Sequence, residues 1–209
     1  MPSQLPPQFS SSASDKACRK AIRSQIREAR RSLTTEQQDS FAMTAADYTL
    51  SRLKQLKAQR VALYLTNDGE LDTKPLIEAL WQSKIEVYLP RLHPFSPGNL
   101  LFFRYQADTK MQKNHMSIWE PKLNITQMLL PHQIDVVITP LVAFDLQGNR
   151  MGMGGGFYDR TLANWQHKRK PLPIGYAHDC QQVGSLPCEH WDVPLPFIIT
   201  PSHCHSFEL

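Results

Sequence analysis

The chain has 209 residues, of which 41% are hydrophobic and 20% charged, with a formal net charge of +4 at pH 7. This length predicts one domain with a sizeable core. No apolar run could cross a bilayer, and the first fifteen residues lack the charged start and apolar centre of a secretory signal, so we expect a cytoplasmic protein without a membrane partner. The four cysteines form no Cys-x-x-Cys pair, which argues against a zinc site or a disulfide framework.

The start of the chain is rich in serine, proline and glutamine, so we expect residues 1–15 to form a disordered leader before a domain spanning 16–209. From Ala17 onward, Ile22 and Ile26 fall on one helical face and the rest is cationic. The cations are Lys16, Arg19, Lys20, Arg23, Arg27, Arg30 and Arg31, against the acid Glu28. Cations packed this closely repel one another unless an anion lies nearby.

Three interpretations of this basic helix stay open: a solvated face, a nucleic-acid surface, or a polyphosphate site completed from elsewhere in the fold. The modest net charge and the lack of a nucleic-acid reader motif argue against nucleic acid. We expect Arg27, Arg30 and Arg31 to be surface charges.

Helices and strands then alternate along the chain. Thr34 with Gln37 forms a capping box that starts a second helix. The inward face of that helix is expected to carry Phe41, Ala45, Tyr48 and Leu53. Thr73 with Pro75 opens another helix. Apolar runs predict strands at 61–65, 86–89, 100–105, 134–139, 174–177 and 197–200. The predicted fold class is α/β, a single domain with a mainly parallel sheet sandwiched between helices.

Four of the nine glycines fall between Arg150 and Arg160, after the apolar run 134–139 and before a helix-compatible pattern from Phe157 to Trp165. Glycine contributes no side chain to a core, so this cluster predicts a backbone that approaches something closely. A glycine loop that leads into a helix suits a phosphate, because its amides and the helix N-terminus attract an anion. A turn without a ligand is the alternative.

Two common nucleotide signatures fit this loop badly. No Lys-Ser or Lys-Thr pair follows the glycines, which excludes a P-loop, and the third glycine of a dinucleotide motif is replaced by Phe157. The flanking arginines together with Tyr158 and Asp159 still favour an anion site over a ligand-free turn.

The stretch 148–160, preceded by 140–145, resembles the signature of the 5-formyltetrahydrofolate cyclo-ligase family, also called 5,10-methenyltetrahydrofolate synthetases. Four short motifs occur in that family's order, at 70–73, 87–90, 118–121 and 189–192. The resemblance covers nearly everything from Lys16 to Pro201. It implies ATP-dependent cyclisation of 5-formyltetrahydrofolate to 5,10-methenyltetrahydrofolate, with release of ADP and phosphate.

The resemblance also implies an ATP site. In the family, a lysine and an arginine four residues apart on the first helix contact the nucleotide phosphates, and the matching residues are Arg19 and Arg23. Because Arg19 stands where lysine is usual, Lys20 is an alternative contact. The other implied ATP-binding residues are Arg150, Met151, Gly152, Met153, Gly154, Gly155, Gly156, Phe157 and Tyr158.

A carboxylate beside a triphosphate is repelled unless a cation is present, so the resemblance implies Mg²⁺ at Asp159, with Asp192 as a second ligand. Glu70 is assigned to the pterin, since a carboxylate can accept paired donors from an aminopyrimidine ring. The implied folate-binding residues are Leu65, Glu70, Gly154, Gly155, Gly156, Phe157 and Tyr158.

The implied mechanism begins with attack of the N5-formyl oxygen on the γ-phosphate of ATP, which gives an imidate phosphate. N10 then adds to the activated carbon, and phosphate leaves. Because the nucleophiles belong to the substrate, the protein supplies positioning and charge stabilisation. Arg150 and Tyr158 are the implied catalytic residues. We expect a monomer that binds no nucleic acid. A non-catalytic nucleotide-binding regulator of the same fold and a nucleic-acid module are the alternatives.

Overall fold

The computed structural model describes residues 13–208 of the chain. Its first helix, α1 (Ala13–Arg31), begins three residues before the predicted domain boundary at residue 16. Residues 13–15 therefore belong to this helix. The rest of the predicted leader, 1–12, lies outside the described residues.

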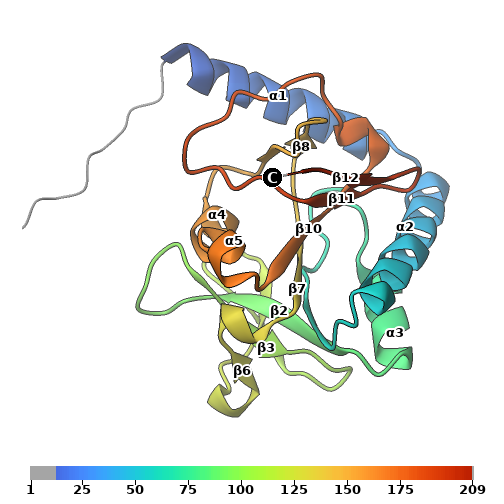
Figure 1. Cartoon of the computed structure of the whole chain (residues 1–209), viewed down its shortest axis with the longest axis vertical. Helices are drawn as coiled ribbons and strands as arrows, with labels where there is room; N and C mark the ends of the chain where they lie inside the picture. The colour runs from blue at the N-terminus through green and yellow to red at the C-terminus, as the bar shows by residue number, and fades with distance from the viewer. Residues whose placement is uncertain (1–12, 209) are drawn as a thin grey trace, which may run out of the picture.

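An eight-stranded sheet forms the centre of the domain (Figure 1). Its order is β12 (Cys204–Ser206), β11 (Phe197–Ile199), β10 (Leu172–Tyr176), β7 (Val136–Thr139), β1 (Arg60–Ala62), β2 (Glu86–Leu92), β3 (Leu100–Arg104) and β6 (Met128–Leu129). The five strands from β11 to β2 are parallel, whereas β12, β3 and β6 run antiparallel to their neighbours. The predicted α/β class with a mainly parallel sheet is confirmed.

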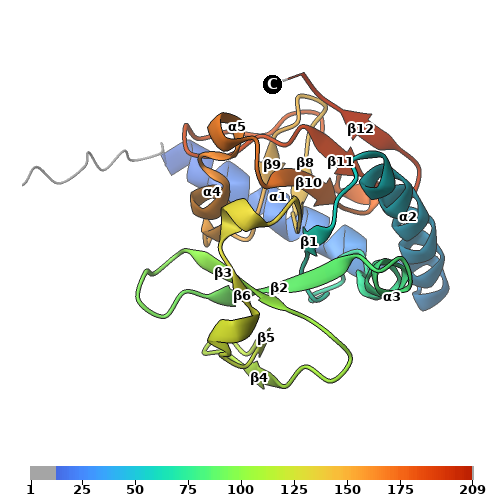
Figure 2. The ribbon, with the colours of Figure 1, turned by 60° about the horizontal axis from the view of Figure 1, so that its bottom comes forward.

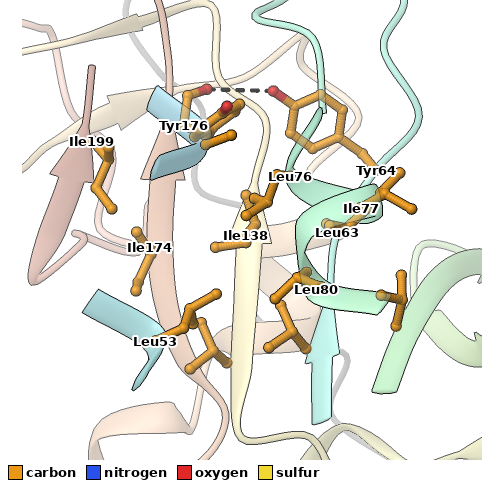
Figure 3. Close-up of a cluster of buried hydrophobic side chains, with 14 of the residues drawn as sticks. Leu53, Leu63, Tyr64, Leu76, Ile77, Leu80, Ile138, Ile174, Tyr176 and Ile199 are labelled. Carbon is orange, nitrogen blue, oxygen red and sulfur yellow. Dashed lines mark hydrogen bonds between the residues drawn. The ribbon is translucent and has the colours of Figure 1, made fainter. Parts of the chain in front are cut away.

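Helices α2 (Thr35–Gln55) and α3 (Lys74–Gln82) cover one face of the sheet. The predicted capping box is present, with the Gln37 amide donating to the Thr34 hydroxyl at 3.2 Å and the Gln37 side chain accepting from the Thr34 amide at 2.9 Å. Figure 3 shows Leu53 of α2 and Leu80 of α3 packed toward the isoleucines of the central strands. This face contains the larger part of the core.

One predicted core position on α2 is wrong. Tyr48 is 46% exposed, whereas Ala45, Thr49 and Leu53 are fully buried. The residues at spacings of four define the inward stripe of the helix, and Tyr48 lies one residue, or about 100°, away from Thr49.

Helices α4 (Phe157–Leu162) and α5 (Trp165–Lys168) cover the opposite face. Leu162 packs there against Ala62 and Val137, whose neighbours along each strand face the first layer. All four residues of β7 are buried, as expected for a strand covered on both sides. The sheet is thus enclosed between helices, as the sequence predicts.

Helix α1 lies across the carboxyl edge of the parallel strands rather than on either face (Figures 1 and 2). It contacts η3 (Asp179–Gln181), which follows β10, and β8 (Ala143–Phe144), which follows β7. Ile26 is its buried apolar residue among those described, and Ile22 is partly buried beside it. Such a small apolar contact leaves much of the docking of this helix to its polar side chains.

Several short elements were not predicted from the sequence. Two hairpins, β4 (Met111–Lys113) with β5 (Trp119–Pro121) and β8 with β9 (Arg150–Met151), lie outside the main sheet. Two 3₁₀ turns, η1 (Ile125–Gln127) and η2 (Pro131–Gln133), flank β6. Runs of two or three residues are too short to show a period.

The helix-compatible pattern from Phe157 to Trp165 forms two short helices rather than one. The chain breaks between Leu162 and Trp165, where Asn164 precedes α5 with φ −109° and ψ 16°. Asparagine favours such turn conformations because its side chain competes for backbone hydrogen bonds. Among the described residues, no helix combines the length and the apolarity that a membrane span needs.

The core on the α2 and α3 face gives a direct stability test. Leu80 is fully buried, so Leu80→Ala is expected to lower the free energy of unfolding by about 2–5 kcal/mol through lost burial and a residual cavity. Met43→Ala, at a position that is 59% exposed on α2, is the control and should change it by less than about 0.5 kcal/mol. Urea denaturation measures both, and equal losses would contradict this packing.

Candidate active site

A cleft of about 280 Å³ opens at the carboxyl edge of the sheet. Its walls come from the segments that follow β1 and β7, from the end of β2, from the glycine loop 152–156 and from the β4–β5 hairpin. The carboxyl ends of parallel strands are the usual binding edge of such sheets, because the connecting loops converge there. Arg19 and Arg23 of α1 complete the lining.

The glycine loop has a backbone that other residues adopt only with strain. Gly154 has φ +98° and Gly156 has φ +64°, both in the left-handed region. The Gly155 carbonyl accepts a hydrogen bond from the Arg160 guanidinium, whose Nε also donates to the Gly98 carbonyl at 2.9 Å. Arg160 therefore braces the loop against the β2–β3 turn instead of facing the cleft with a free charge.

Two arginines of α1 reach the cleft. Arg23 donates from Nε to the Gly152 carbonyl at 2.8 Å, and a Cβ atom built at Gly154 would lie 3.7 Å from its Nη2. Arg19 donates to the Asp192 carboxylate at 2.6 Å and to the Pro187 carbonyl at 2.8 Å. Lys20 is exposed and does not line the cleft, so the geometry favours Arg19 over Lys20 as an anion contact.

Arg150 lies beneath the loop and is only 4% exposed. Its Nη2 donates to Asp159 Oδ1 at 2.6 Å, and the same oxygen accepts the Val193 amide at 3.1 Å. Burial lowers the pKa of Arg150, and the Asp159 charge partly offsets this effect. Within the described part of the chain, Nε of Arg150 has no hydrogen-bond partner. A buried guanidinium with unused donors can bind an anion strongly.

The two predicted metal ligands, Asp159 and Asp192, both line the cleft. Each is already paired with an arginine, Asp159 with Arg150 and Asp192 with Arg19. The described residues contain no cluster of three or more acidic, histidine or cysteine side chains that could hold a metal ion alone. Two carboxylates do fit Mg²⁺, provided that substrate phosphates and water supply the other ligands.

Glu70 also lines the cleft, from the loop between β1 and α3. Burial raises the pKa of its carboxyl group to about 7, although the nearby Arg30 charge acts in the opposite direction. Burial and the charge of Glu70 raise the pKa of Tyr158, so its phenol stays protonated and can donate. Leu65 and Phe157 also line the cleft.

The prediction that Arg27, Arg30 and Arg31 are surface charges is wrong for Arg30, whose side chain is fully buried. All three arginines converge on the Asp68 carboxylate, two residues before Glu70. These hydrogen bonds lower the pKa of Asp68 despite its partial burial. The acceptor is distant in sequence, so helical periodicity alone could not identify it.

Sequence reasoning assigned no role to the β4–β5 hairpin, although its motif at 118–121 matched the family pattern. The hairpin adds Met116, Ile118 and Trp119 to the cleft wall. It is anchored by Glu120, which is 4% exposed and pairs with Arg91 at 2.7 Å. The exposed apolar residues of the motif were the available signal, because such residues often line binding grooves.

An α/β sheet with arginines around a glycine loop at its carboxyl edge is the arrangement of an enzyme that binds an anionic substrate. Comparison with known proteins agrees with this class. The model of the 5-formyltetrahydrofolate cyclo-ligase family matches residues 15–201, so the chain belongs to this family and is an enzyme of the cyclo-ligase class.

Relatives match over most of their length. The 5-formyltetrahydrofolate cyclo-ligase of Escherichia coli K12 is 55% identical over 177 residues, which cover 85% of this chain and 97% of the relative. The Haemophilus influenzae enzyme of the same name is 52% identical, covering 85% and 94%. The NMR structure of Aquifex aeolicus 5,10-methenyltetrahydrofolate synthetase has a TM-score of 0.77 at 26% identity, covering 91% of this chain and 93% of that one.

The raised pKa of Glu70 predicts a pH-dependent gain on its replacement. In the unfolded chain, a glutamate ionises near its ordinary pKa of 4.5. In the folded protein, Glu70 ionises only near its raised pKa of about 7. Its contribution to stability is therefore full below pH 4.5 and is lost as the pH rises through about 7. We expect Glu70→Gln to have a higher Tm than the starting protein. The difference in Tm should grow between pH 4.5 and 7 and stay constant above pH 7.

Glu78→Gln is the matched control, because Glu78 is exposed on α3. Its effect on Tm should stay flat over the same range of pH. A Tm difference for Glu70→Gln that does not vary with pH would contradict the buried environment of this carboxylate.

Proposed function

We propose that the protein converts 5-formyltetrahydrofolate to 5,10-methenyltetrahydrofolate at the expense of ATP, which becomes ADP and phosphate. One observation carries this proposal: a single cleft is lined both by the arginine-flanked glycine loop and by the half-buried Glu70. The loop suits phosphates, and the carboxylate suits an aminopyrimidine ring. The names of the relatives support the reaction.

The triphosphate of ATP binds between the loop amides and the guanidinium groups of Arg19, Arg23 and Arg150. A second groove of about 590 Å³ adjoins the other side of the loop and shares Gly154 and Gly156 with the cleft. Its walls include Trp165 and Trp191, whose apolar rings suit a nucleoside. The nucleotide base and ribose therefore extend into this groove, and the phosphates reach the cleft across the loop.

Asp159 and Asp192 hold Mg²⁺ together with the phosphates of ATP. The bound metal offsets charge on the transferring phosphoryl group. Asp159 keeps Oδ1 for Arg150 and Val193, and among the described residues no hydrogen bond occupies its other oxygen.

The folate pterin binds Glu70, with Leu65, Phe157 and Tyr158 as apolar and aromatic walls. The N5-formyl oxygen attacks the γ-phosphorus, the bond to ADP breaks, and an imidate phosphate forms. N10 then adds to the formyl carbon, and phosphate and the N10 proton leave. Tyr158, a neutral donor, orients the formyl oxygen, while Arg150 stabilises charge on the phosphoryl group.

Methenyl absorbance tests this function directly. Purified protein mixed with 5-formyltetrahydrofolate, ATP and Mg²⁺ is expected to form product with equimolar ADP, and chelation of the metal should stop the reaction. A nucleotide-binding regulator of the same fold would bind ATP and form no methenyl product. A nucleic-acid module would bind duplex DNA in a salt-sensitive manner. Either outcome without product would refute the proposal.

Removal of the Arg150 guanidinium should separate folding from catalysis. Arg150→Met keeps most of the side-chain volume, so we expect a folded protein whose kcat falls about 100-fold or more, because a preorganised charge at the phosphoryl group is lost. Arg104→Met, an arginine that pairs with Glu86 away from the cleft, is the control and should retain kcat. Circular dichroism verifies folding, and near-normal turnover of folded Arg150→Met would contradict the role.

A further inference from the structure

The loop that carries Glu70 is fastened to the far half of α1. Asp68 Oδ2 accepts from Arg27 Nε at 2.7 Å and from Arg30 Nη2 at 2.8 Å, and Oδ1 accepts from Arg31. Gly69 brings the loop against the helix, since a Cβ atom built there would lie 3.6 Å from the Arg30 carbonyl oxygen. We call this arrangement of Asp68 with the three arginines the Asp68 clasp.

Arg30 differs from the other two arginines of the clasp. Its side chain is fully buried, whereas those of Arg27 and Arg31 are 34% and 54% exposed. It also donates from Nε to the backbone carbonyl of Asp68 at 2.8 Å, so it holds both the side chain and the main chain of the loop. Over the described residues, its Nη1 is buried without a hydrogen-bond partner. Burial of a cation in this way costs free energy. A clasp with a purely structural role would not need a buried arginine.

The ionisable groups around Glu70 give Arg30 a second role. They come from four elements and are Arg30 on α1, Asp68 on the same loop, Tyr64 after β1, Tyr158 on α4 and His178 beside η3. The pKa of His178 is lowered to about 4, mainly by burial and further by the Arg30 charge, so its ring is neutral at pH 7. The two tyrosines are neutral as well, because burial raises the pKa of each. Arg30 is thus the cation of this group.

We propose that Arg30 is a positioning residue for Glu70: fixed by Asp68, its buried guanidinium holds the β1–α3 loop against α1 and favours the ionised form of the Glu70 carboxylate, which accepts donors from the substrate pterin. This role rests on the proposed function, in which Glu70 binds the pterin. Arg27 and Arg31 orient Asp68 from the solvent side, and their charges are screened there.

The test compares Arg30→Met with Arg31→Met as matched control, since both remove one guanidinium from the clasp. For each, KM for 5-formyltetrahydrofolate, KM for ATP and kcat are measured from pH 6 to 9. Arg30→Met is expected to move the midpoint of folate affinity upward by about one pH unit, so KM for folate at pH 7 rises roughly fivefold. KM for ATP, and kcat at saturating folate and pH 9, should stay within about twofold of the starting enzyme.

The control should leave the midpoint in place. Arg30→Lys, which keeps the charge, should restore most of the shift. If Arg30→Met does not fold, Arg30→Gln replaces it in the same comparison. A folded variant whose folate KM rises equally at every pH would overturn the proposal, because loss of a merely structural clasp weakens binding without moving the midpoint.

A second measurement separates this inference from the function on which it rests. NMR titration of the Glu70 side-chain carboxyl in the protein without substrate reports its ionisation directly. If its titration moves upward in Arg30→Met while folate affinity does not follow, the Arg30 role stands and the assignment of Glu70 to the pterin fails. If the titration does not move, the Arg30 role fails whatever the enzyme assays give.

Discussion

The pairing of one arginine stripe with fixed acceptors determines how this active-site cleft is built. Arg19, Arg23, Arg27 and Arg30 follow one another at spacings of three and four, so they lie along the same side of α1. Their acceptors are Asp192, the Gly152 carbonyl and Asp68, which belong to three separate loops. The helix buries little apolar surface of its own, and its position depends heavily on these contacts. A change at any of the acceptors therefore disturbs the cleft as well as the helix.

This arrangement also keeps like charges apart. A triphosphate and the Glu70 carboxylate are both anionic, and their mutual repulsion would oppose simultaneous binding at short range. Arg19 and Arg30 are eleven residues apart on α1, which corresponds to about 16 Å along a helix. The glycine loop is served by one end of the stripe and the Glu70 loop by the other. Under the proposed function, one rigid element thereby sets the separation of the phosphate site and the pterin site, and supplies a cation to each.

How far the sequence could predict this structure depended on how local each signal is. The long apolar runs identified the central parallel strands, because a strand buried on both faces needs no partner to be recognised. The glycine stretch and Glu70 were placed in one cleft because their motifs matched a family. The burial of Arg30 was missed, since it depends on Asp68, 38 residues away, in a stretch that resembles an ordinary turn. The β4–β5 hairpin was missed for a related reason: its pairing, not its composition, makes it a wall of the site.

The arginine–aspartate pairs explain how so cationic a site can be stable and still bind a polyanion. Arg19 with Asp192 and Arg150 with Asp159 neutralise one another across the cleft, so the guanidinium groups do not repel one another unopposed. Under the proposed function, an incoming triphosphate would share these guanidinium donors with the carboxylates. Asp159 would keep Oδ1 on Arg150 and Val193, while its other oxygen would be available to Mg²⁺. The negative charge of the phosphates would then be met both by the guanidinium groups and by the metal that accompanies ATP.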